Sequence, residues 1–217
     1  KGPQPKTGFF QSAVFSKNQD LSGSSTVTPS TEMNPDELML PRDMAWDLYQ
    51  PFIVNEMVKS GYKPLDAHVA VKNHDPQANL ALERAVRDRP VWVNRAPSLH
   101  KFSVLAMQPK LYDGKSIRVH PLVVGGFNMD FDGDTAGLYV PVSNKAVEEA
   151  KNFFPTKVLE HAADQRIMLA PSHDLMTGLY YMTKPGKDLN NTYGSVEDAM
   201  KDYKTKAIEI HDFVTIG

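Results

Sequence analysis

The sequence contains no cysteine. Disulfide bonds and thiolate metal sites are therefore excluded, and a reducing compartment is favoured. No apolar run approaches the roughly 20 residues that a membrane-spanning helix needs, and no signal-peptide pattern opens the chain. We accordingly expect a cytoplasmic protein with no membrane partner. The chain begins at Lys1 rather than methionine, so we also expect a fragment of something longer.

A strong net charge is absent as well. The formal net charge is −2, so the chain as a whole lacks the electrostatic footprint of an autonomous nucleic-acid binder. Hydrophobic residues make up 41% and charged residues 23%, which is ordinary for a globular protein. No Ser-His-Asp order, G-x-G-x-x-G element or Walker loop is found, which argues against hydrolase, dehydrogenase and P-loop functions.

Hydrophobic periodicity and turn residues predict an α+β fold. The expected strands cover residues 24–28, 91–93, 102–109, 117–127, 138–142 and 207–216. The expected helices cover residues 41–61, 76–88, 143–153, a short segment ending at 181, and 195–204, with a helical turn at 35–37 before them. In the second of these helices we place Leu80 and Leu82 on or near the buried side.

Charge is concentrated at Asp130, Asp132 and Asp134, which follow an apolar run. Carboxylates at this spacing cannot share a helical face, and on one side of a strand they would repel each other without a cation. A tight turn beginning at Gly133 would let all three converge. Oxygen ligands of this density favour a hard divalent cation, Mg²⁺ or Ca²⁺, over zinc or copper. The alternative without a metal is a solvated acidic turn.

The calcium alternative is an EF-hand, whose loop begins D-x-D-x-D-G. The match fails because Thr135 occupies the glycine position and Pro141 the position of the bidentate glutamate. A Mg²⁺ site that also holds phosphate oxygens of a substrate is the better chemical fit. For two further residues a structural role is the alternative to a substrate or metal contact. Arg95 could be a surface arginine, and His120 a hydrogen-bonded core histidine within a strand.

Several segments resemble the largest, beta-prime-type subunit of multisubunit DNA-dependent RNA polymerases. Residues 128–134 are similar to the family's N-A-D-F-D-G-D element, and residues 94–101 to its N-R-A-P-T-L-H-R element. The segments 120–123, 178–183 and, more loosely, 41–61 also match, in the family's order. The resemblance covers nearly the whole chain and is highly specific.

The resemblance implies a double-psi β-barrel catalytic domain within an α+β chain. Asp130, Asp132 and Asp134 would hold the catalytic Mg²⁺ of nucleotidyl transfer, while a second Mg²⁺ arrives with the nucleoside triphosphate (NTP). Arg95 and Asn128 stand where the family reads the ribose hydroxyls of the incoming nucleotide, and we place Pro97, between them in sequence, among the substrate-binding residues. The implied partners are the second-largest, beta-type subunit, the remainder of the beta-prime subunit, the DNA template, the RNA product and NTPs.

The sequence departs from the family near residues 17–25, where the family resembles K-R-V-D-Y-S-G-R-S. Asn18 and Ser24 replace two arginines that approach the template, so Lys17 alone is left as a nucleic-acid contact. Met129 replaces a near-invariant alanine. This drift suggests a divergent enzyme, such as that of a large phage with a split beta-prime subunit, acting in the bacterial host cytoplasm or in the virion.

We expect a switch-like N-terminal loop segment at residues 1–23 and the barrel at 24–143, with a helical insertion at about 35–90. A C-terminal helical active-site segment would follow at 144–217. Two rival functions remain: an RNA-templated or single-chain two-barrel polymerase, which also carries a D-x-D-G-D loop, and a non-catalytic barrel scaffold.

Overall fold

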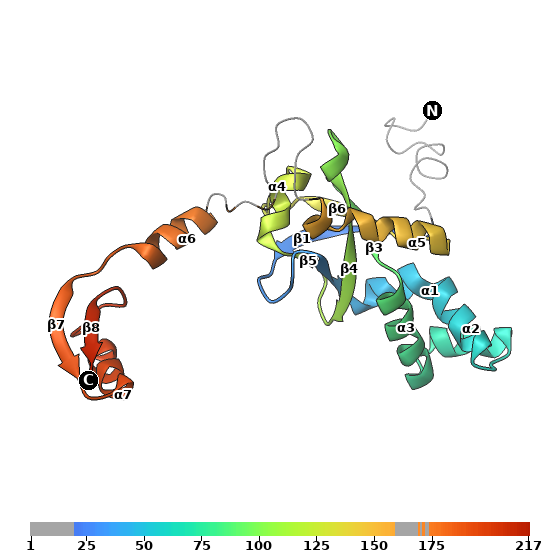
Figure 1. Cartoon of the computed structure of the whole chain (residues 1–217). Helices are drawn as coiled ribbons and strands as arrows, with labels where there is room; N and C mark the ends of the chain where they lie inside the picture. Colours follow the sequence, from blue (N-terminus) through green and yellow to red (C-terminus); the bar gives the residue numbers. More distant parts are fainter. Residues whose placement is uncertain (1–19, 159–168, 170, 172–173) are drawn as a thin grey trace, which may run out of the picture. The chain divides into compact units, whose positions relative to one another are not determined.

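The computed structural model describes residues 20–158, 169, 171 and 174–217. The chain divides into two compact units, one ending at Ala170 and one running from Pro171 to Gly217. The first unit contains a closed barrel (Figure 1) and the loop of residues 128–134, the aspartate loop, which carries Asp130, Asp132 and Asp134. Among the described residues, no helix combines the length and apolar character that crossing a membrane requires.

Six strands close the barrel in the order β1-β5-β2-β4-β3-β6. They are β1 (Ser22–Pro29), β2 (Glu37–Pro41), β3 (Val91–Asn94), β4 (Val104–Tyr112), β5 (Ile117–Val119) and β6 (Thr135–Tyr139). The β1–β5 and β2–β4 pairs are parallel, and the remaining pairs are antiparallel. This mixed barrel with its helices confirms the expected α+β class and double-psi β-barrel.

The barrel is filled by side chains that alternate along the strands. In β3, Val91 and Val93 are fully buried, and in β2 the same holds for Leu38 and Leu40. This period of two places one face of each strand inward, where apolar side chains are removed from water. The closed arrangement therefore gives the loops at its ends a rigid base.

Helices form the insertion between β2 and β3. They are α1 (Arg42–Lys59), α2 (Pro64–Lys72) and α3 (Pro76–Asp88), which lie together beside the barrel (Figure 1). Tyr49 of α1 is fully buried, and its hydroxyl donates a hydrogen bond to the Arg89 carbonyl at 2.8 Å. Farther along the chain, α4 (Val124–Phe127) precedes the aspartate loop, and α5 (Asn144–Ala150) is capped by the Ser143 hydroxyl.

Arg89 joins these helices to the segment after β6. Its Nη1 donates to the carbonyls of Pro141 at 3.0 Å and Val142 at 2.9 Å, and its guanidinium lies 4.3 Å from the Phe52 ring centroid. We expect Arg89→Ala to lower the free energy of unfolding by about 2 kcal/mol, because two carbonyls lose a charged donor and the ring loses its cation. Urea titration would measure this.

The matched control for that variant is Arg87→Ala. Arg87 has a side chain 77% exposed and only a 3.9 Å ion pair with Asp88. Its removal should change the stability by less than about 0.5 kcal/mol. Equal losses in the two variants would contradict a structural role for Arg89.

The second unit contains α6 (Asp174–Thr183), β7 (Asp188–Tyr193), α7 (Val196–Lys204) and β8 (Phe213–Ile216). Its two strands pair in parallel. The predicted helix at 195–204 is confirmed, with the Ser195 hydroxyl accepting a hydrogen bond from the Asp198 N–H as the N-cap. The predicted strand at 207–216 is reduced to its last four residues. The domain boundaries at residues 23 and 143 stay a prediction.

The turn expected at residues 35–37 is present at residues 35 and 36, where the Glu37 N–H donates to the Asn34 carbonyl at 2.9 Å, and β2 begins at Glu37. Two other local predictions in the first unit were wrong. The strand expected at 117–127 ends at Val119, and Pro121, which has no N–H to donate to a neighbouring strand, opens a 3₁₀ turn. Leu80 is 49% exposed, so the buried side of α3 does not include it.

Candidate metal centre

The aspartate loop is anchored at both ends. On one side Phe127, the last residue of α4, is buried, and the Met129 N–H donates to the Val124 carbonyl at 3.2 Å. On the other side the Asp134 carbonyl accepts from the Val27 N–H at 3.0 Å, which ties the loop to β1. Hydrogen bonds and burial therefore hold both ends of the loop in place against the barrel.

Two residues give the loop its shape. Asn128 has φ 47° and ψ 49°, the left-handed conformation that asparagine tolerates better than most residues, and it ends α4. Gly133 has φ +126°, where other residues are strained. The turn that we expected at Gly133 is thus present, and it reverses the chain between Asp132 and Asp134.

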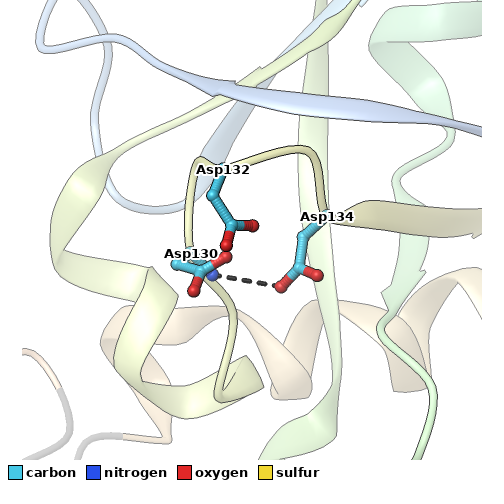
Figure 2. A group of neighbouring side chains, drawn as sticks. All are labelled: Asp130, Asp132 and Asp134. Atoms are coloured by element: carbon cyan, nitrogen blue, oxygen red, sulfur yellow. Dashed lines mark hydrogen bonds between the residues drawn. The ribbon is translucent and has the colours of Figure 1, made fainter.

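The three carboxylates converge. One oxygen from each of Asp130, Asp132 and Asp134 lies within 4.8 Å of the others, and Figure 2 shows the side chains pointing toward a common point. The Asp130 N–H donates to Asp134 Oδ2 at 3.2 Å, which closes the loop. Asp130 and Asp132 are exposed, so a cation and its remaining ligands can reach them from solvent.

Asp132 and Asp134 have pKa values shifted from the ordinary value, in opposite directions. A hydrogen bond with Asp130 and the repulsion of its charge raise the pKa of Asp132. Hydrogen bonds from Arg95 lower the pKa of Asp134. Close carboxylates without a cation disfavour their joint ionisation, whereas a basic neighbour favours the charged form. The loop is therefore a concentrated negative site, and within the described part of the chain it has one counter-ion.

That counter-ion is Arg95, the residue directly after β3. Its Nε donates to Asp134 Oδ2 at 2.7 Å and its Nη2 to Asp134 Oδ1 at 3.1 Å, a bidentate pair. The side chains of Arg95 and Asp134 are only 23% and 21% exposed. The antiparallel pairing of Asn94 with Gly137 in β3 and β6 brings the two residues together.

The other predicted site residues lie around the loop or outside the described part of the chain. Pro97 is exposed in the segment after Arg95, where the Ser98 hydroxyl donates to Asn94 Oδ1 at 2.7 Å. Lys17 is outside the described residues. His120 is hydrogen-bonded as expected, accepting from the Leu122 N–H, but it caps the 3₁₀ turn rather than lying in a strand, and burial lowers its pKa.

Sequence reasoning missed the contact between Arg95 and Asp134. The two residues are far apart in the chain, and only the pairing of β3 with β6 places them side by side. No local pattern specifies which strands of a barrel become neighbours. The residue types alone carried a signal, since an arginine that follows a strand near an acidic loop is a natural partner for a carboxylate.

Residues 63–156 match the family described as RNA polymerase Rpb1, domain 2. The similarity to curated proteins is broader. The DNA-directed RNA polymerase subunit gamma of Rippkaea orientalis is 35% identical over 96% of this chain, which spans 35% of that subunit. The beta′ subunit of Cyanidium caldarium is 34% identical over 97% of this chain and is covered over 34% of its own length.

A beta′ subunit from Dehalococcoides mccartyi is 35% identical over 97% of this chain, which spans 17% of that protein. The chain is therefore homologous to a portion of the beta-prime-type subunit of DNA-directed RNA polymerases, as its motifs indicated. It spans about a third or less of the length of these curated relatives. The family match covers α2, α3, the strands β3 to β6, the aspartate loop and α5.

Proposed function

We propose that this chain is the catalytic-centre portion of the largest subunit of a DNA-directed RNA polymerase, transferring nucleotides from NTPs to the RNA 3′ end. One observation carries the proposal. Three carboxylates of one barrel loop converge on a common point, in a chain homologous to polymerase subunits. Catalysis of phosphoryl transfer is mainly positioning and charge neutralisation, which a fixed carboxylate loop serves.

Asp130, Asp132 and Asp134 fit a magnesium ion. They supply only oxygen ligands, their oxygens lie within reach of one centre, and two of the three are open to solvent, water and phosphate. When bound there, Mg²⁺ would neutralise charge on the phosphates and help to activate the RNA 3′ hydroxyl, together with a second ion that enters with the NTP. The rigid loop would keep the carboxylates aligned on that centre.

Arg95 and Asn128 are proposed to read the ribose of the incoming nucleotide. Arg95 follows β3 and Asn128 ends α4, so both adjoin the carboxylate loop. A guanidinium and an amide can each bond a 2′ hydroxyl. Pro97 belongs to the exposed segment next to Arg95 and is proposed to line the same substrate region, while Lys17 is kept as a proposed nucleic-acid contact.

Ribonucleotide preference should depend on these two side chains. We expect Arg95→Ala and Asn128→Ala each to lower the preference for NTPs over deoxy-NTPs by about tenfold, because a lost hydrogen bond to the 2′ hydroxyl is worth roughly 1–2 kcal/mol. Single-nucleotide incorporation by the assembled enzyme measures the ratio. Ser98→Ala, in the same exposed segment as Pro97, serves as control, and an unchanged ratio in both test variants would remove the assignment.

The chain would act only with partners. It spans about a third or less of its relatives, so the remainder of the beta-prime subunit and the beta-type second subunit are proposed to complete the centre and hold DNA, RNA and NTP. We propose a bacterial cytoplasm or a virion as its location, and a divergent, phage-encoded enzyme as its source. The three-part division at residues 23 and 143 belongs to the same proposal.

Template preference tests the function against its rival. The chain, purified with the subunits that accompany it, should synthesise RNA on a DNA template and not on an RNA template of the same sequence. Its relatives are named as DNA-directed polymerase subunits, which favours this result. Synthesis on RNA alone would support the RNA-templated rival instead, and copurification with no other polymerase-like subunit would contradict the multisubunit proposal.

A further inference from the structure

Both oxygens of the Asp134 carboxylate are engaged before any cation is considered. Oδ2 accepts from Arg95 Nε at 2.7 Å and from the Asp130 N–H at 3.2 Å, and Oδ1 accepts from Arg95 Nη2 at 3.1 Å. A carboxylate offers about four acceptor positions in all. Oδ2 has therefore filled both of its positions, and Oδ1 has filled one of two.

Asp130 and Asp132 differ from Asp134 in this respect. Within the described part of the chain, Arg95 is the one basic side chain in ion-pair contact with the loop, and its partner is Asp134. Asp130 and Asp132 are exposed and lie against each other. Among the described residues, a divalent cation that approaches from solvent thus meets two carboxylates that have no basic partner and a third that is bound by a guanidinium.

We propose that Arg95 is the exchangeable counter-ion of this centre: it neutralises Asp134 in the metal-free loop, and a divalent cation displaces it from that carboxylate. The inference rests on the proposed metal centre and deepens it. A divalent cation and a guanidinium that share one carboxylate repel each other, so the binding of either one to Asp134 weakens the binding of the other. Displacement frees the guanidinium for the ribose, which couples cation binding to sugar reading through one side chain.

Cation affinity of the full chain tests the exchange directly. Mn²⁺ serves as the probe because its free ion gives an electron paramagnetic resonance signal that disappears on binding, and Mg²⁺ is then added as competitor. Arg95→Ala should bind Mn²⁺ about fivefold or more tightly than the unchanged chain, since one competing charge is removed from a partly buried carboxylate. Arg95→Lys keeps the charge without the fork and should fall between the two.

Two controls separate this inference from the proposal beneath it. Arg87→Ala, which removes an exposed charge from α3, should leave the affinity unchanged. Asp132→Ala should weaken binding at least tenfold. If Asp132→Ala has no effect, the loop is no metal site and both proposals fall. If Asp132→Ala weakens binding while Arg95→Ala equals the unchanged chain or binds less tightly, the exchange alone is overturned.

A second readout follows Arg95 itself. The Nε–H of Arg95 is hydrogen-bonded to Asp134. Before Mg²⁺ is added, its nuclear magnetic resonance signal, assigned by its loss in Arg95→Lys, should therefore be protected from exchange with solvent. Saturating Mg²⁺ should accelerate that exchange severalfold while leaving the amide signals of buried Val93 and Leu138 unchanged. Protection that persists at saturating Mg²⁺ would show that the guanidinium stays in place and would overturn the exchange.

Discussion

Replacing Asp132 by alanine is expected to reduce RNA synthesis at least about a thousandfold in the assembled enzyme, because a lost ligand of a catalytic cation removes several kcal/mol of transition-state stabilisation. Of the three acids, Asp132 is the best position for testing the loss of a metal ligand alone. Asp134 also accepts hydrogen bonds from Arg95 and the Asp130 N–H, so its removal would loosen the loop as well. Asp132 is exposed at the turn, and its truncation leaves those bonds intact.

The comparison that makes this result specific is Asp113→Ala. Asp113 is also an exposed aspartate of the barrel, with a side chain 92% exposed and a 3.5 Å ion pair with Arg42. Its variant should assemble and synthesise RNA at the unchanged rate. Synthesis retained in Asp132→Ala would contradict the catalytic assignment and favour the scaffold alternative, provided that gel filtration shows both variants in the assembly.

The turn of the aspartate loop could be predicted because the residues that set its local backbone conformation lie close together in the sequence. The spacing of Asp130, Asp132 and Asp134 excludes a helical face, and Gly133 supplies the one backbone conformation that a tight reversal needs. These are local constraints, and local constraints are readable from a single sequence. The helix at 76–88 was predicted to the residue for the same reason, since Pro76 starts it and its apolar positions recur at helical spacing.

The barrel around the loop could be predicted only through the family resemblance. Strand β2 pairs in parallel with β4, which is far away in sequence, and its five residues give too short a pattern to distinguish from a turn. The apolar run at 117–127 favours a strand by composition, yet Pro121 interrupts it, and the rest bends into the helix α4. Neighbours within a closed sheet are set by packing of the whole barrel, not by local propensity.

Because strand pairing could not be predicted, one contact of the site, that of Arg95, could not be predicted either. The resemblance placed Arg95 beside the substrate, but the contact that it makes with Asp134 depends on the β3–β6 pairing, which no residue pattern announces. The carboxylates were therefore predictable and their electrostatic state was not. A loop with three free acids and a loop with one neutralised acid have different cation affinities, so this missing contact changes the expected chemistry.

Phe127→Ala is expected to lower the free energy of unfolding by about 3–5 kcal/mol, the usual cost of removing a fully buried aromatic ring. Phe127 is 1% exposed, and it ends the short helix that leads into Asn128 and the aspartates. Its buried ring thus fixes the end of α4, from which the aspartate loop begins. A cavity at this position should both destabilise the barrel and weaken Mn²⁺ binding, since the left-handed turn at Asn128 loses its support.

Phe131→Ala is the control that separates burial from residue type. Phe131 lies within the aspartate loop itself and is 36% exposed, so its truncation should cost less than about 1 kcal/mol. Urea unfolding measures both variants, and Phe127→Leu, which keeps most of the buried volume, should recover most of the loss. Equal costs at Phe127 and Phe131 would mean that the loop does not depend on the barrel for its shape, and the convergence of the carboxylates would then need another cause.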